Sequence, residues 1–347
     1  WRLAPSPHRR SAAAILTIRP RRVGRSPTGR EAGKVAVETS SLITDRIDAV
    51  TKISASHLRL EPPAPKSVKI ELTANCNYRC TFCVKSLRPD DGEMDRAFFS
   101  RIIREIRDSG VDELGVFYIG ESFTCKWLPE AIAEAKEVGF PYVFLTTNGS
   151  VGTPEKVEAC MKAGLDSLKF SINFSDEEQF KNVARVKPSL YQKALHNLKE
   201  ARKIRDEGGY KCGLYASSIA FDGEQGERMR ALIDEHVLPV VDEFYWLPLF
   251  DMGGAARGKT PTAGNPGRLG NMRDPLPCWA VVDEGHITKD GLLAACCFGT
   301  GIDGDLIMAD LKEVDFMTGW NSEKFQTLRR AHLAKDVRGT ACEECIA

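Results

Sequence analysis

Three cysteines stand close together in one short segment of the sequence, Cys76-Asn-Tyr-Arg-Cys80-Thr-Phe-Cys83. The C-x3-C-x2-C spacing allows three thiolates to converge from a single turn. A cubane iron–sulfur cluster that only carries electrons is normally held by four cysteines. Three thiolates leave one iron with an open coordination position, as catalytic metal sites require. The motif therefore predicts an iron–sulfur cluster at which a substrate or cofactor binds, with a zinc site or unrelated thiols as the alternative.

Four more cysteines form a second set near the end of the chain: Cys278, Cys296, Cys342 and Cys345. Four thiolates make a closed site, and both structural zinc and a [4Fe–4S] cluster accept that ligand set. Cys297 is a rival to its neighbour Cys296, and we favour Cys296 because Gly291 stands five residues before it. From the residues alone, zinc and iron both remain open at this second site.

The eleven cysteines are clustered in a chain of 347 residues, whereas a secreted disulfide framework usually belongs to a short chain. We therefore expect metal or cluster binding in a reducing compartment, the cytoplasm. Cys125, Cys160 and Cys212 are expected to be buried hydrophobic residues. Lys and Arg together number 48, as do Asp and Glu, so no overall field draws the protein to nucleic acid or to an anionic membrane. No apolar run approaches the roughly 20 residues that a membrane helix needs.

Short apolar or β-branched runs alternate with longer amphipathic segments from Ser67 onward, the pattern of βα units around a parallel sheet. The predicted strands are Val68–Leu72, Glu113–Ile119, Tyr142–Thr146, Ser167–Ile172, Gly213–Ala220 and Val240–Leu247. The predicted helices are Asp95–Asp108, Leu128–Glu137, Pro154–Ala163, Leu190–Arg205 and Glu224–Glu235. Six units are fewer than the eight of a closed TIM barrel, so the expected fold class is α/β, with a partial, open-sided (β/α)6 TIM-like barrel.

Composition divides the chain into four parts. They are an N-terminal extension (1–65), a barrel core (66–250), a Gly/Pro-rich linker (251–276) and a small C-terminal cluster-binding module (277–347). The first 30 residues are rich in Arg, lack acids and are expected to be disordered; a transit peptide, a tag, an over-extended reading frame and a truncated fragment are the alternatives. The C-terminal module is expected to contain a hairpin over Ala280–Ala295 and a closing helix over Ser322–Ala334.

The first cysteine motif, with the aromatic Phe82 directly before its last cysteine, resembles the defining motif of the radical S-adenosylmethionine (SAM) superfamily. The resemblance implies a [4Fe–4S] cluster held by Cys76, Cys80 and Cys83, whose open iron chelates the amino and carboxylate groups of SAM. It also implies that one electron from an external reductant, such as flavodoxin or ferredoxin, cleaves SAM to a 5′-deoxyadenosyl radical that abstracts hydrogen from a substrate carbon. The cofactor then carries the radical chemistry, and the protein positions the atoms.

The same resemblance assigns SAM binding to the end of the second predicted strand. Gly120-Glu121-Ser122 resembles the family's Gly-Gly-Glu motif, whose backbone and acid receive the SAM amino group. Ile119 replaces the first Gly, which is a mild departure because backbone groups still offer hydrogen bonds. Gly120 and Glu121 are therefore expected to bind SAM, with a solvated acid at a strand end as the alternative for Glu121.

The next two strand ends complete the expected SAM pocket. Asn148 lies in the turn Thr147-Asn148-Gly149, at the face where parallel barrels place their ligands, and the resemblance puts it near the ribose or adenine. Ser171 and Asn173 stand where related enzymes hydrogen-bond the ribose or the methionine carboxylate. An ordinary capping role is the alternative for Ser171. The sequence identifies no catalytic base or hydrogen donor.

The second cysteine set resembles the twitch module, the shortened relative of the SPASM extension, and it follows the core motif as in those enzymes. The resemblance implies one auxiliary [4Fe–4S] cluster bound by Cys278, Cys296, Cys342 and Cys345. Closed ligation suggests an electron conduit that removes the second electron from a substrate radical, which favours net oxidation by an oxidoreductase. By analogy with radical SAM dehydrogenases of aminocyclitols, the expected substrate is a sugar or aminocyclitol alcohol.

Two other functions remain open at this level. The chain could be a peptide-modifying maturase that acts on a ribosomal precursor, although residues 31–65 are too few for the winged-helix domain that such maturases often carry. It could also be a non-catalytic iron–sulfur or zinc scaffold protein, an idea that conflicts with the open three-cysteine site. The expected partners are thus a small-molecule or peptide substrate and a one-electron reductant, with no nucleic acid and no membrane.

Overall fold

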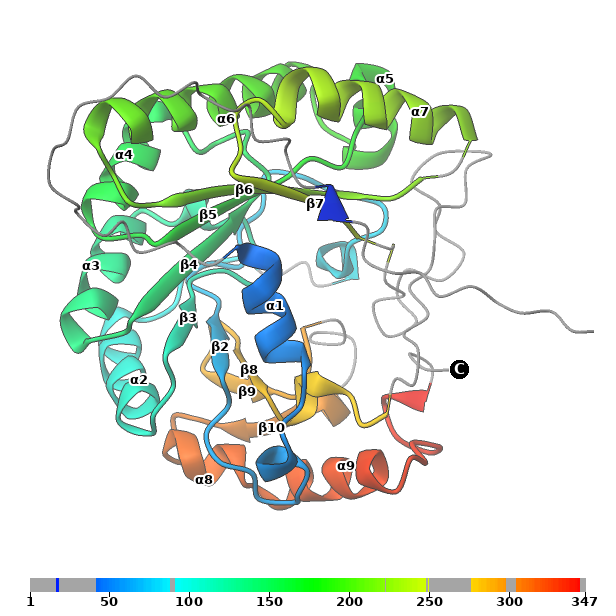
Figure 1. Ribbon diagram of the computed structural model, residues 1–347. Helices are drawn as coiled ribbons and strands as arrows, with labels where there is room; N and C mark the ends of the chain where they lie inside the picture. The colour runs from blue at the N-terminus through cyan, green and yellow to red at the C-terminus, as the bar shows by residue number, and fades with distance from the viewer. Residues whose placement is uncertain are drawn as a thin grey trace, which may run out of the picture.

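The computed structural model describes residues 17–18, 42–87, 91–221, 223–247, 249, 276–297 and 304–343. Its centre is one curved sheet with the strand order β1-β7-β6-β5-β4-β3-β2-β8-β9-β10. Strands β2 to β7 are parallel and lie in chain order. Among these described strands, the two edge strands β1 and β10 do not pair with each other, so the barrel stays open (Figure 1). The fold is the partial (β/α)6 TIM-like barrel that the sequence predicts.

Six parallel strands form the barrel, and each overlaps a strand predicted from the sequence. They are β2 (Ser67–Ile70), β3 (Glu113–Gly115), β4 (Tyr142–Thr147), β5 (Ser167–Ser171), β6 (Gly213–Ile219) and β7 (Glu243–Leu247). Side chains alternate between the two faces of a strand. In β5, Leu168 and Phe170 are fully buried in the hydrophobic core, whereas Lys169 and Ser171 are only half-buried. Lys169 and Ser171 therefore face the interior of the barrel.

Helices on the outer face of the sheet join the successive strands (Figure 1). They are α2 (Arg96–Asp108), α3 (Leu128–Val138), α4 (Pro154–Lys162), α5 (Glu177–Ala184), α6 (Ser189–Gly208) and α7 (Gly223–Leu232). In α2, the Asp95 side chain caps the helix by accepting from the Phe98 backbone N–H, and Phe99, Ile102 and Ile106 are buried. None of the described helices combines the length and the apolar composition that crossing a bilayer requires.

Helix α5 is absent from the sequence-based prediction, which passes directly from β5 to α6. Asp176 caps it by accepting a hydrogen bond from the Gln179 backbone N–H, and Phe180 and Val183 are buried on its inner side. Its eight residues span only about two turns, too few for an apolar period to stand out. Helix α5 nevertheless matters for the site, because its last turn contacts the first cysteine motif.

Helix α1 (Ile43–Thr51) lies inside the arc of strands and helices (Figure 1). Arg46 forms an ion pair with Glu113 at 2.7 Å, and its guanidinium lies 3.6 Å from the centre of the Tyr142 ring. Glu113 and Tyr142 are the first residues of β3 and β4, so α1 covers the amino-terminal end of the barrel. This described part of the predicted N-terminal extension therefore packs as a piece of the barrel.

The C-terminal module continues the same sheet. Its elements are η5 (Trp279–Val281), β8 (Glu284–Ile287), β9 (Leu292–Ala294), η6 (Gly304–Leu306), β10 (Ile307–Asp310), α8 (Phe316–Trp320) and α9 (Glu323–Leu333). Strand β8 pairs in parallel with β2, and β8 and β9 form the predicted hairpin. At the hairpin turn, Gly291 has a φ of 81°, a conformation that favours glycine. The module that contains the second cysteine set is thus joined directly to β2, the strand that precedes the first cysteine motif.

The remaining short elements are β1 (Thr17–Ile18), η1 (Ala55–His57), η2 (Val84–Leu87), η3 (Ser122–Thr124) and the π-helical turn η4 (Ile233–Val237). Strand β1 pairs antiparallel with β7. The other residues of the predicted disordered segment 1–30 and nearly all of the predicted linker 251–276 lie outside the described residues. The domain boundaries given above stay predictions.

Candidate functional site

The loop after β2 contains the three cysteines of the first motif, Cys76, Cys80 and Cys83, and all three are half-buried. Two backbone hydrogen bonds join this loop to the last turn of α5. The Arg79 N–H donates to the Ala184 carbonyl at 2.9 Å, and the Thr81 N–H donates to the Val183 carbonyl at 3.0 Å. The loop is therefore held from both sides, by β2 on one side and by α5 on the other.

The three thiols influence one another electrostatically. The pKa of Cys76 is raised to about 12, first by burial and then by the charges of Glu121 and Cys83. Burial, followed by the charges of Cys83 and Cys76, raises the pKa of Cys80 well above its ordinary value. The sulfurs are thus neighbours in a site that disfavours three bare thiolates. Positively charged iron offsets both effects, so this donor set fits an iron–sulfur cluster.

The arrangement of the three cysteines differs from that of a site for a single metal ion. Within the described part of the chain, no three His, Cys, Asp or Glu side chains are arranged so that they could hold one metal ion. In a cubane cluster each cysteine binds a different iron, so the sulfurs stand around the cluster instead of meeting at one point. The spread of Cys76, Cys80 and Cys83 along one loop is compatible with that arrangement and unlike a zinc site.

Gly120 and Glu121 bring the segment that follows β3 into contact with the residues that lead into the cysteine loop. A Cβ atom at Gly120 would lie 2.0 Å from the Thr73 carbonyl oxygen, so only glycine fits there. The Glu121 N–H donates to the Asn75 carbonyl at 2.8 Å. Thr73 and Asn75 lead from β2 into the first cysteine. The close approach that Gly120 permits therefore brings the strand-end backbone next to the predicted cluster.

The Glu121 carboxylate is buried and already has protein partners. It accepts hydrogen bonds from the Thr147 hydroxyl at 2.7 Å, the Asn148 N–H at 2.7 Å and the Phe123 N–H at 3.2 Å. Burial raises the pKa of Glu121, and these hydrogen bonds oppose the rise. The acid therefore joins the segment after β3 to the end of β4, and the backbone around Gly120 is the part of the motif left to meet a ligand.

Asn148 links the turn after β4 to the cysteine loop. Its Nδ2 donates to Asn77 Oδ1 at 2.9 Å, and its Oδ1 accepts from the Ser150 N–H and hydroxyl at 2.9 and 2.8 Å. Asn77 Nδ2 in turn donates to the Ser150 hydroxyl at 2.8 Å. Because Asn77 directly follows Cys76, the structure brings Asn148 to the first cysteine motif, as predicted for one pocket.

The remaining predicted SAM-binding residues lie at the same end of the barrel. Ser171 ends β5 and lines a small cavity. The Asn173 side chain accepts a hydrogen bond from the Ile219 N–H at 3.1 Å, which joins the ends of β5 and β6. Phe82 is 8% exposed and packs in the core beneath the cysteine loop. Of the three, Ser171 is the one that the structure places at the wall of a cavity.

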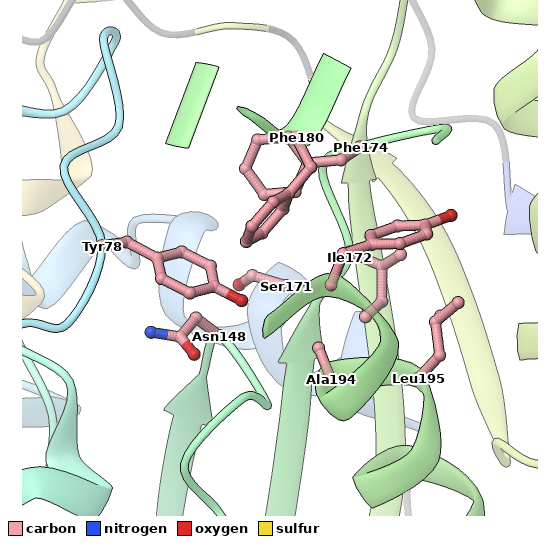
Figure 2. A pocket seen from close by; sticks show the side chains of 9 residues that line it. Tyr78, Asn148, Ser171, Ile172, Phe174, Phe180, Ala194 and Leu195 are labelled. Carbon is pink, nitrogen blue, oxygen red and sulfur yellow. The ribbon is translucent and has the colours of Figure 1, made fainter. Parts of the chain in front are cut away.

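This cavity has an aromatic wall that the sequence analysis missed. Its lining includes Tyr78, Asn148, Ser171, Phe174, Phe180 and Leu195. The Tyr78 ring packs edge-on against Phe174 and Phe180, at centroid distances of 6.3 and 5.2 Å. Figure 2 shows the Tyr78 ring directed toward Ser171, with Asn148 below this ring and both phenylalanines above Ser171. The cavity volume is about 10 Å³, room for about one water, so a larger ligand requires these rings to move.

A sequence signal for this wall existed in the segment after β5. Asp176 is followed by two acids and then by Phe180 and Val183, which is a helix cap followed by an apolar pair at helical spacing. A helix predicted at this position would have placed Phe180 near the cysteine loop. Tyr78 offered no such signal, because its burial depends on elements more than 90 residues away.

The described cysteines of the second set are half-buried at separate points of the C-terminal module. Cys278 precedes η5, Cys296 follows β9 and Cys342 follows α9, whereas Cys345 lies outside the described residues. The Cys278 N–H donates to His332 Nδ1 at 3.1 Å, which ties this cysteine to α9. The Tyr118 hydroxyl, from the segment after β3, donates to the Cys296 carbonyl at 3.1 Å. The module is thus joined to the barrel directly at one predicted ligand.

Cys296 and Cys297 lie together, so the structure does not decide between them as ligands. The pKa of the Cys297 thiol is raised, first by its interaction with Cys296 and then by burial, and the neighbouring His286 opposes the rise. His286 is fully buried and contacts Glu284 at 2.8 Å. The choice of Cys296 over Cys297 stays a prediction.

Cys125, Cys160 and Cys212 are buried, as expected of hydrophobic residues. Burial raises the pKa of Cys125 and Cys160 to about 12 and that of Cys212 still further. A thiol becomes reactive when its pKa is lowered, so these three are poorly suited to nucleophilic chemistry.

Comparison with known proteins agrees with this geometry. Residues 70–235 match the Radical SAM superfamily, and residues 278–346 match the SPASM iron–sulfur cluster-binding domain. A GTP 3′,8-cyclase from Chlorobaculum tepidum is 33% identical over 120 residues, which is 34% of this chain and 36% of that protein. The matched segment thus spans about a third of that relative. The predicted resemblance to radical SAM proteins with a SPASM-type module is confirmed.

Solved structures share the fold at low sequence identity. BtrN, a 2-deoxy-scyllo-inosamine dehydrogenase solved with AdoMet and 2-DOIA, has a TM-score of 0.53 at 14% identity, covering 81% of this chain and 91% of BtrN. SuiB from Streptococcus suis, solved with its precursor peptide SuiA, has a TM-score of 0.61 at 15% identity, covering 82% of this chain and 70% of SuiB. The two domains together imply a [4Fe–4S] cluster with SAM and auxiliary iron–sulfur binding.

Proposed function

We propose that this chain, which carries a radical SAM domain and a SPASM domain, is an enzyme that cleaves SAM reductively and abstracts hydrogen from a substrate carbon. The observation that carries the proposal is the loop of Cys76, Cys80 and Cys83, whose three neighbouring, half-buried thiols leave one iron of a cubane open. When bound, the cluster and SAM supply the 5′-deoxyadenosyl radical. The electron comes from an external reductant such as flavodoxin or ferredoxin.

The chain's own residues shape the SAM pocket. We assign the backbone around Gly120 to the SAM amino group, because Glu121 is engaged with Thr147 and Asn148 and fixes that backbone in place. Ser171 and Asn173 are assigned to the ribose or the methionine carboxylate. Phe82, in the core beneath the loop, supports the cysteines from below.

We assign the aromatic cavity to the adenine end of SAM. Asn148 and Ser171 line this cavity together with Tyr78, Phe174 and Phe180, which would pack against a purine. The present volume is too small for a purine, so binding requires Tyr78 or Phe174 to rotate away. Asn148 offers its backbone carbonyl, because its side chain is held by Asn77 and Ser150.

We further propose net oxidation of the substrate. Cys278, Cys296, Cys342 and Cys345 would hold an auxiliary [4Fe–4S] cluster on the module that β8 attaches to β2. A substrate radical beside it can lose its remaining electron there. The substrate then gives up one hydrogen atom to the 5′-deoxyadenosyl radical, one electron to the cluster and one proton to the protein or solvent. The fold shared with BtrN supports a sugar or aminocyclitol alcohol as the first substrate class to test.

A peptide substrate is the second candidate. The fold similarity to SuiB, which was solved with a precursor peptide, has a higher TM-score than the similarity to BtrN, 0.61 against 0.53. An open-sided barrel can admit a peptide as well as a small molecule. Deuterated sugar alcohols and deuterated peptides should therefore be compared for label transfer into 5′-deoxyadenosine. Transfer from peptides alone would replace the first candidate by the second.

The first test is metal content after anaerobic reconstitution. We expect about eight irons and eight sulfides per chain, and about four of each in a variant with Cys76, Cys80 and Cys83 all changed to Ala. The intact protein should form 5′-deoxyadenosine from SAM with dithionite, and the triple variant should form none. Intact clusters without any 5′-deoxyadenosine would instead favour a non-catalytic scaffold. Zinc in place of iron in the triple variant would make the second site structural.

A further inference from the structure

Lys169 places an amine deep inside the barrel. It lies two residues before Ser171 on β5 and faces the same interior side. Strands rise about 3.3 Å per residue, so Lys169 lies about 7 Å further than Ser171 from the carboxyl ends of the barrel strands. Ser171 lines the cavity that we assign to SAM. Lys169 is therefore below the cavity that we assign to SAM, on the interior side of the barrel.

A second lysine faces the same interior from another strand of the curved sheet. Lys69, on β2, forms an ion pair with Glu284 at 2.7 Å. Its amine also lies 5.8 Å from the centre of the Phe117 ring and 6.0 Å from that of Trp279. The positive charge of Lys69 is thus balanced by a carboxylate on β8, and Glu284 makes a further contact with His286 at 2.8 Å.

Lys169 has no such counterion among the described residues. Its amine lies 5.8 Å from the centre of the Tyr245 ring, a weak cation–π contact. Burial and then the like charge of Lys69 lower the pKa of Lys169 to about 8.

Tyr215 and Tyr245 face Lys169 from β6 and β7, and burial raises their pKa values, so they stay neutral. Glu243 lies on the same face of β7 and accepts a hydrogen bond from the Thr44 N–H of α1. Among the described residues, the nearby carboxylates therefore have other partners: Glu284 pairs with Lys69, Glu113 with Arg46, and Glu243 with the Thr44 N–H.

An amine held inside a protein without a counterion costs free energy, so its retention points to a ligand that completes the pair. We infer that Lys169 binds a carboxylate of the substrate, which enters the barrel beneath SAM. The inference rests on the proposed function and replaces its aminocyclitol candidate by an acidic substrate. An aminocyclitol would bring a second positive charge toward Lys169 and Lys69, whereas an acidic substrate would neutralise the unpaired one. The lysine ammonium then donates hydrogen bonds to the carboxylate oxygens.

Binding of a small dicarboxylate tests the site without any turnover. We would titrate malonate, and malonamide as its neutral counterpart, into the anaerobically reconstituted enzyme by calorimetry. The unaltered protein should bind malonate and not malonamide. Lys169→Met should weaken malonate binding at least about tenfold, as the loss of a charge-assisted hydrogen bond does, and Lys169→Arg should keep most of it. Lys193→Met, on the exposed side of α6, is the matched control and should bind malonate normally.

The outcomes separate this inference from its alternatives. Absence of malonate binding in the unaltered protein, or equal binding by Lys169→Met and Lys193→Met, overturns the inference. The carboxylate of SAM is the other possible occupant, so SAM binding is measured for the same variants by equilibrium dialysis. A tenfold loss of SAM affinity in Lys169→Met would assign the lysine to SAM and overturn the substrate assignment. Failure to form 5′-deoxyadenosine with malonate binding intact would sink the proposed function and leave the anion site standing.

Discussion

The Asn148 backbone N–H donates to the Glu121 carboxylate at 2.7 Å, and this bond ties the end of β4 to the segment that follows β3. Both segments contact the loop of the first cysteine motif, Glu121 through the Asn75 carbonyl and Asn148 through Asn77. A carboxylate that resembles a ligand-binding acid in sequence therefore serves to hold the pocket together. The expected SAM contacts depend on it even if it touches no ligand.

Glu121→Gln should destabilise the protein by about 1–3 kcal/mol. One amide oxygen cannot accept from Thr147, Phe123 and Asn148 together, and the new NH2 group would face a buried N–H donor. Urea unfolding measures the loss, and equilibrium dialysis should show weaker SAM binding. Glu137→Gln, at an exposed position of α3, is the control. Unchanged unfolding of Glu121→Gln would show that the carboxylate does not join the strands.

Gly120→Ala should disrupt the first cluster more than it disrupts the fold. The new methyl group would stand 2.0 Å from the Thr73 carbonyl oxygen, and a backbone atom can move away only if the cysteine loop moves with it. We expect about half of the iron to be lost on reconstitution, because the clash falls on Thr73 and Asn75, which lead into the loop of the first cluster. Gly304→Ala is the matched control, because its Cβ would meet nothing within 4 Å. Full iron content in Gly120→Ala would refute the close-contact argument.

Much of this arrangement follows from local sequence. The six barrel strands are β-branched or apolar runs, and their positions come directly from that pattern. The cysteine loop follows from the spacing of Cys76, Cys80 and Cys83, because three thiols within eight residues must lie near one another. Gly120 was predicted from the resemblance of its segment to the family's Gly-Gly-Glu motif, and Asn148 from a turn at the face where parallel barrels place their ligands.

The rest depends on contacts between distant segments, which a local pattern does not contain. Lys69 and Glu284 are 215 positions apart, and nothing near either residue indicates that β8 pairs with β2. Tyr78 is buried because Phe174 and helix α5 pack against it over the cysteine loop. In the sequence, Lys169 resembles a solvent-exposed lysine of a strand. Only the arrangement of the whole sheet shows that it faces the interior of the barrel. Such pairings are set by the packing of the whole sheet.

Cys296→Ala should lose the second cluster, whereas Cys297→Ala should keep it. This prediction follows from the position of Gly291, which turns the β8–β9 hairpin five residues before Cys296. We expect about four irons per chain in Cys296→Ala and about eight in Cys297→Ala after reconstitution. Electron paramagnetic resonance of the reduced proteins counts the clusters independently. The opposite result would make Cys297 the ligand and leave Cys296 as its neighbour.

Lys169→Met should make the protein more stable at neutral pH, by about 1–3 kcal/mol. The methionine side chain fills similar space and removes an amine whose pKa falls from 10.5 to about 8 on folding. Between these two values the unfolded chain still binds a proton that the folded protein has released, so the stability of the unaltered protein rises with pH. The advantage of the variant should therefore be largest below pH 8 and shrink toward pH 10.5.

Urea unfolding of both proteins at several pH values measures this difference, in which the other titrating groups largely cancel. Lys193→Met should show no comparable gain, because Lys193 is exposed on α6 and its charge is already hydrated. If Lys169→Met is instead less stable than the unaltered protein, the amine has a stabilising partner and is not held in reserve for a substrate. A stability gain together with lost malonate binding is the expected signature of a residue kept for binding at the expense of stability.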